Sequence, residues 1–154
     1  MTNDDRSKSH LIKVTFELPP GAWHGSATET LWAEPIGAEK YRLENSPFFA
    51  LGVSYGDVVL ATPTTKGAIF AETFTRGGHS TYRIVPRPDR AVEFETAWAP
   101  LQALGCTYEE GPNGLLAVDV PPETNIFEVY TALEAGESEG AWTFEEGHCG
   151  HAVG

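Results

Sequence analysis

The chain has 154 residues, of which 41% are hydrophobic and 11% aromatic, enough for one domain or for two small subdomains that share a core. It carries 22 acidic and 10 basic residues, a formal net charge of −12, and only two cysteines. These features argue against an intrinsically disordered chain, a membrane-spanning chain and a fold held together by disulfide bonds. They predict a cytoplasmic protein with two free thiols.

The charge is distributed unevenly along the chain. Residues 1–88 contain nine acidic and nine basic residues, whereas residues 89–154 contain thirteen acidic residues and one basic residue, Arg90. Such a negative half repels phosphate backbones, so nucleic-acid binding by it is disfavoured. The same charge attracts basic proteins and accelerates their association, or it serves solubility alone, and the sequence leaves both interpretations open.

The first half is predicted to consist of short strands. Residues 12–18 alternate apolar and polar side chains with the period of a half-buried strand. Further strands are predicted at residues 28–34, 41–43, 57–62, 68–75 and 80–85. Gly77 and Gly78 favour a hairpin loop between the last two strands. Several short strands at close spacing indicate a small barrel or a strongly curved sheet.

The second half adds two helices. One is predicted over residues 91–104, either kinked at Pro100 or beginning near Ala97. The other is predicted over residues 125–135, with Thr124 as its N-cap and Gly136 as its end. Strands are predicted at residues 106–110, 115–120 and 141–145.

These elements predict an α+β fold with a small β-barrel-like first part. Together with strand 80–85, the second half has the order β-α-β-β-α-β, which is typical of a split-βαβ, ferredoxin-like unit with both helices on one face of the sheet. The predicted segments are a disordered tail (1–10), a strand-rich subdomain (11–88), an acidic α/β subdomain (89–146) completed by strand 80–85, and a flexible tail (147–154).

Several segments carry a recognisable wording, namely Glu29–Ala33, Tyr41–Leu43, Asn45, Pro47–Phe49, Gly52–Val59 and Gly78–Arg83. Together they resemble a bacterial family known as domain of unknown function 4265. The similarity extends from about Lys13 to Glu145 and implies no activity, because the family has none assigned. The acidic half is also similar, in architecture alone, to inhibitors of the regulator of ribonuclease activity B type.

Residues that can carry chemistry do not fall into a known catalytic motif, so the sequence gives no sign of an enzyme. Asp57 is either a catalytic carboxylate or the residue that closes the turn before Val58. His148, Cys149 and His151 are metal-like ligands, but a structural zinc site needs four, so neither a metal nor a cofactor is predicted.

The favoured function is a non-enzymatic acidic binding protein, such as an inhibitor, an immunity protein or a regulator, that docks on a basic protein partner. Its predicted contact residues are Glu109, Glu110, Glu137, Glu139, Trp142, Glu145 and Glu146. Trp142 is either an exposed anchor or a core residue. The alternative is a small enzyme or ligand-binding protein with a pocket between the two halves, formed by Tyr55, Asp57, Arg76, His79 and Tyr82.

Overall fold

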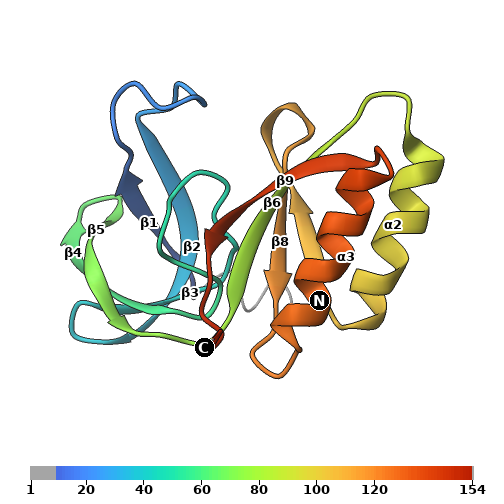
Figure 1. Cartoon of the computed structure of the whole chain (residues 1–154). Helices are drawn as coiled ribbons and strands as arrows, with labels where there is room; N and C mark the ends of the chain where they lie inside the picture. The colour runs from blue at the N-terminus through green and yellow to red at the C-terminus, as the bar shows by residue number, and fades with distance from the viewer. Residues whose placement is uncertain (1–9, 154) are drawn as a thin grey trace, which may run out of the picture.

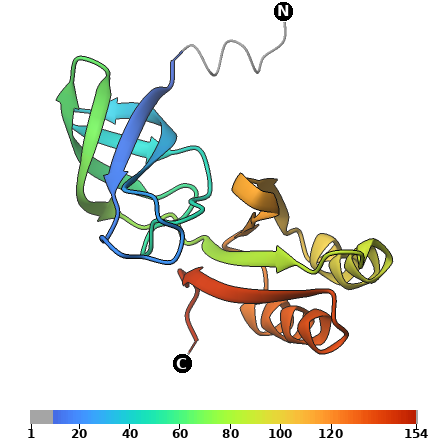
Figure 2. The same cartoon turned by 90° about the horizontal axis from the view of Figure 1, so that it is seen from above.

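The computed structural model describes residues 10–153, which form two units that lie side by side (Figure 1, Figure 2). The first unit is a closed barrel of five strands, and the second is a four-stranded sheet covered by two helices. The predicted α+β class and the barrel-like first part are therefore confirmed. Nine of the ten residues of the predicted N-terminal tail lie outside the described residues.

The barrel contains the first five strands in chain order. These are β1 (Ile12–Glu17), β2 (Thr28–Gly37), β3 (Lys40–Leu43), β4 (Val58–Thr64) and β5 (Gly67–Thr75). Alternate side chains point inward, as a half-buried strand requires, so that Val14 and Phe16 of β1 are buried. Parallel pairing of β1 with β5 closes the barrel. Gly67 permits this closure, because a Cβ there would overlap the backbone carbonyl of Lys13.

The second unit contains the remaining elements. These are β6 (Ser80–Pro86), α2 (Ala91–Ala103), β7 (Thr107–Glu110), the short 3₁₀ turn Pro112–Gly114, β8 (Leu116–Val120), α3 (Ile126–Ser138) and β9 (Trp142–His148). The strands pair antiparallel in the order β7-β8-β6-β9. Both helices cover the face of the sheet that is turned away from the barrel (Figure 1). No helix within residues 10–153 has the length and apolarity needed to cross a bilayer.

The helix boundaries differ from the prediction at three points. α2 begins at Ala91 with Pro100 in its interior, so the later start near Ala97 is wrong. The N-cap of α3 is Asn125, whose Oδ1 accepts the backbone N–H groups of Phe127 and Glu128, and not Thr124. Gly136 does not end α3 either. It lies inside the helix, which continues to Ser138. A glycine is required at this position because a Cβ would overlap the ring of Trp142.

The predicted hairpin at Gly77 and Gly78 is also wrong. β5 pairs only within the barrel and β6 pairs with β8 and β9, so residues 76–79 connect the two units. The glycine signal has a packing cause, since a Cβ at Gly77 would lie 2.6 Å from the carbonyl oxygen of Gly56. The last strand continues to His148, beyond Gly147, where a flexible tail was expected to start.

The two units are joined through the loop between β3 and β4, residues 44–57. From the barrel, the carboxylate of Glu29 accepts the backbone N–H groups of Phe48 (2.6 Å), Phe49 (3.0 Å) and Ala50 (2.8 Å). From the sheet, Nη2 of Arg83 donates to the backbone carbonyl of Ala50 and to that of Pro47 (3.4 Å). The loop is therefore held between an anion of one unit and a cation of the other.

Further contacts attach the same loop to the sheet. Glu109 of β7 accepts the Asn45 side-chain amide (3.1 Å) and the Ser46 backbone N–H (2.8 Å). Thr81 of β6 donates to the hydroxyl of Ser54 (2.7 Å). Because Thr81, Arg83, Ser46 and Ser54 are all buried, these hydrogen bonds satisfy groups that have little access to water.

We expect Glu29→Gln to lower the free energy of unfolding by about 1–3 kcal/mol, because one carboxylate that accepts three backbone donors becomes a neutral amide with a single acceptor oxygen. Urea unfolding followed by fluorescence measures this change. Glu17→Gln, an exposed acid of the same barrel, is the matched control and should change the stability by less than about 0.5 kcal/mol. Equal effects of the two substitutions would contradict the role given to Glu29.

Candidate functional site

A groove of about 850 Å³ runs between α2 and α3 on the exposed side of the helix layer. Small side chains form much of its lining, among them Ala103 of α2 and Ala132 and Ala135 of α3. Phe127 lines the groove at the first turn of α3 and is largely exposed. The two helices therefore leave an open, mainly apolar channel.

Pro100 gives the groove one polar feature. Proline has no backbone N–H, so the carbonyl of Thr96, four residues earlier, lacks its α-helical donor. Both residues line the groove and both are exposed. The groove thus offers a backbone acceptor to a hydrogen-bond donor that enters it.

Two acidic side chains, Glu128 and Glu139, line this groove. Glu95, Glu134 and Glu137 are exposed elsewhere on the same two helices. No lysine or arginine follows Arg90 in the sequence, and Arg90 itself lies 3.6 Å from Glu93. Among the described residues, neither Glu128 nor Glu139 takes part in an ion pair, so the two carboxylates of the groove keep their charge.

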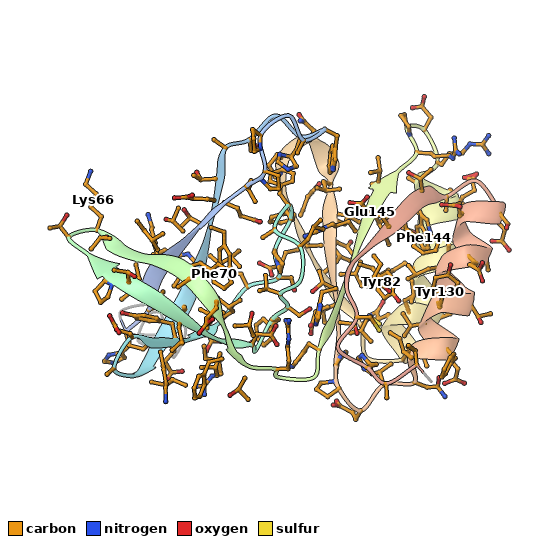
Figure 3. The ribbon with its side chains drawn as sticks, turned by 60° about the vertical axis from the view of Figure 1, so that its left-hand side comes forward. Lys66, Phe70, Tyr82, Tyr130, Phe144 and Glu145 are labelled. Atoms are coloured by element: carbon orange, nitrogen blue, oxygen red, sulfur yellow. The ribbon has the colours of Figure 1, made fainter. Side chains whose placement is uncertain are left out.

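The structure does not bring the seven predicted contact residues to one face. Trp142 is 0% exposed and its Nε1 donates to the carbonyl of Leu133 (3.0 Å), so it is a core residue and not an anchor for a partner. Glu109 contacts the β3–β4 loop, and Glu145 lies on the barrel side of the sheet (Figure 3). Glu137 accepts the backbone N–H of Phe144. Glu110, Glu139 and Glu146 are exposed.

Four of the five predicted pocket residues do gather at the junction of the two units. Asp57 is fully buried, and its carboxylate accepts the backbone N–H groups of Ser54 (3.0 Å) and Gly77 (2.8 Å) and the guanidinium of Arg76 (3.1 Å). The ring of Tyr55 lies 5.2 Å from that of His79. Asp57 therefore closes the turn before β4, as one of the two interpretations held, and its oxygens are already engaged.

Tyr82 does not belong to this group. It faces the helices, where its ring lies 6.3 Å from that of Phe144 and where Tyr130 of α3 also contacts Phe144 (Figure 3). Burial raises the pKa of the Tyr82 hydroxyl, and the nearby charge of Glu146 raises the same pKa by a smaller amount. Strand alternation explains the error, since residues 81 and 83 of β6 face the barrel and residue 82 cannot.

The sequence interpretation missed Asp119, which completes the junction. His79 Nδ1 lies 2.8 Å from Asp119 Oδ1, and a hollow of about 270 Å³ is lined by Asp119, Tyr55 and Glu109. Burial raises the pKa of Asp119, whereas the charge and hydrogen bond of His79 lower it. The available signal was one acidic residue inside an apolar strand, between the buried Val118 and Val120.

His151 and Cys149 of the C-terminal segment contact neighbouring backbone and side-chain groups, and His148 ends β9 with its Nε2 buried and without a partner among the described residues. His151 Nδ1 lies 2.6 Å from the hydroxyl of Ser80, and its Nε2 lies 2.8 Å from the carbonyl of Pro121. Cys149 contacts the carbonyl of His151. Across residues 10–153, no group of three or more histidine, cysteine, aspartate or glutamate side chains is placed to hold a metal ion.

We expect His79→Gln to raise the pKa of Asp119 further, because the substitution removes the cation that favours the carboxylate. Because the pKa of Asp119 is higher in the folded state than in the unfolded state, the free energy of unfolding falls as the pH rises from the unfolded-state pKa to the folded-state pKa. The variant should extend this fall to higher pH. Carboxyl-carbon NMR titration measures the pKa. His24→Gln, in the β1–β2 loop, should leave it unchanged, and a lower pKa in His79→Gln would refute the pairing.

Comparisons with known proteins give the family from one match and the fold from another. The family model described as domain of unknown function (DUF4265) matches residues 29–144. The chain is similar to a hypothetical protein from Neisseria gonorrhoeae of known crystal structure, with a TM-score of 0.76 and 18% identity over 92% of this chain and 97% of that one. No curated protein matches. Because the family model spans well over half of the sequence, the chain belongs to the DUF4265 family.

Proposed function

We propose that this protein is a non-enzymatic binding protein whose groove between α2 and α3 accepts an amphipathic helix from a basic protein partner. The observation that carries the proposal is an apolar groove of about 850 Å³ flanked by unneutralised carboxylates. An inhibitor, an immunity protein or a regulator that binds a cationic surface would use this complementarity of charge.

Apolar contact would provide most of the affinity. Each Å² of apolar surface removed from water contributes about 25 cal/mol, and an amphipathic helix presents its apolar face as a continuous stripe. The small side chains of Ala103, Ala132 and Ala135 permit a partner helix to approach closely. Phe127 is placed to pack against the end of such a stripe.

The acidic residues would provide selectivity and speed. Exposed ion pairs contribute about 0–1 kcal/mol each, so Glu128 and Glu139 add little affinity individually. Their combined field, however, draws in cations and disfavours acidic partners. This electrostatic part is screened over about 8 Å at physiological ionic strength, so binding should weaken as salt is added.

We also assign the second unit to the ferredoxin-like class. The strand order supports this assignment, because the last strand, β9, lies beside the first, β6, and the two middle strands lie on the other side of β6. In this arrangement the outer faces of the two helices are free, which is the surface that the proposed function uses.

A small-molecule site at the junction is the second candidate function. It is favoured by two hollows between the barrel and the sheet, one of about 270 Å³ beside Asp119 and one of about 210 Å³ beside Arg83. Concave sites of this kind occur preferentially between units of a fold.

The groove can be tested with a fluorescently labelled amphipathic peptide made of leucine and lysine, and a leucine/glutamate peptide of equal length for comparison. We expect only the lysine peptide to bind, with an affinity that falls as salt rises. Ala135→Arg should weaken binding at least about tenfold, because it places a bulky cation in the groove. Fluorescence anisotropy gives the dissociation constants.

Two matched controls separate the groove from general charge attraction. Ala99→Arg adds the same cation to the exposed side of α2 outside the groove, and it should have a much smaller effect than Ala135→Arg. Glu128→Gln with Glu139→Gln should weaken binding more than Glu17→Gln with Glu72→Gln, two exposed acids of the barrel. Equal effects within each pair, or equal binding of the two peptides, would overturn the proposal.

A further inference from the structure

A separate crevice of about 210 Å³ lies on the barrel side of the sheet, where the β1–β2 loop approaches β6 and β9. Trp23 of that loop forms one wall and is 68% exposed. Val85 and Leu115 add further apolar surface, and Arg83, Thr143 and Glu145 supply the polar groups. The volume lies below that of pockets for drug-sized molecules, so the crevice suits a small ligand.

Arg83 is the charged group of this crevice that is shielded from water. It is 1% exposed, and its Nε is buried without a hydrogen-bond partner among the described residues. Burial lowers the pKa of the guanidinium, and the charges of Glu29 and Glu145 oppose this shift. An arginine remains charged in proteins, so a buried cation with an unused donor lines the crevice.

Glu145 stands beside Arg83 and yet does not pair with it. The two residues are cross-strand partners in the β6–β9 register, but no ion pair within 4.0 Å joins them in the described structure. Figure 3 shows Glu145 on the side of β9 that faces the barrel, whereas Phe144 points to α3. Thr143 is the next residue of β9 on the same face as Glu145 and lies opposite Val85.

We propose that this crevice binds a free α-amino acid with an apolar side chain. The carboxylate of the ligand would lie against the Arg83 guanidinium, and its ammonium group would lie against Glu145 and the Thr143 hydroxyl. The apolar side chain would pack between Trp23, Val85 and Leu115. A zwitterion supplies both missing partners at once, which neither a simple anion nor a simple cation does. This inference rests on the small-molecule function proposed as the second candidate, and it is independent of the helix groove.

The test is a titration of the full-length protein with L-leucine, followed by ¹⁵N–¹H NMR. We expect saturable shifts at the Trp23 indole and at the backbone amides of Thr143 and Glu145. N-acetyl-leucine lacks the ammonium charge and leucinamide lacks the carboxylate, so each should bind at least about tenfold more weakly. Absence of saturable shifts with L-leucine, or equal binding of either analogue, would overturn the proposal.

Variants test the placement without disturbing the buried arginine, whose loss would also break the contacts to the β3–β4 loop. Trp23→Ala and Glu145→Gln should each weaken L-leucine binding several-fold, because both residues have exposed side chains that line the crevice. Trp32→Ala and Glu72→Gln, on the barrel surface, should leave it unchanged. If the crevice variants bind as the wild type does, the site lies elsewhere and the proposal fails.

Discussion

The arrangement of the whole molecule depends on how the β3–β4 loop is buried. A loop between two packed units carries backbone N–H and C=O groups that have lost water, and each must find a partner. Glu29 accepts the N–H groups of residues 48–50, and Arg83 donates to the carbonyls of Pro47 and Ala50. Residues 47–50 thereby lie between the carboxylate of Glu29 and the guanidinium of Arg83, and these contacts hold the barrel against the sheet.

This constraint gives the two faces of the sheet different chemistry. The barrel face holds Arg83 and Thr81, which contact the loop, and Asp119, which pairs with His79, whereas the helix face is apolar and holds Trp142. The helices cover that apolar face, so their outer sides remain free. Two of the exposed carboxylates of the second half, Glu128 and Glu139, consequently line the groove between α2 and α3.

The parts of the candidate sites that follow local patterns could be predicted. The acidic second half and the two helices were accessible from composition and spacing, whereas the group of Tyr55, Asp57, Arg76 and His79 was only an alternative that the structure brings together at the junction. The grooves and crevices were not, because their lining residues come from segments far apart in the chain. Asp119 illustrates the limit: its strand was predicted, but its partner His79 lies forty residues earlier.

The sequence by itself determined the element types and the charge, since alternation, helical spacing and turn residues act over a few neighbouring positions. Element order already grouped strand 80–85 with the second half, whereas tertiary structure decided its pairing partners and whether an ambiguous residue such as Trp142 was buried. Gly77 and Gly78 carry the signal of a hairpin, yet β6 pairs with β8 and β9 in another sheet. Trp142 is buried because Gly136 leaves room for its ring. Close contacts between distant segments are set by packing, which no local period encodes.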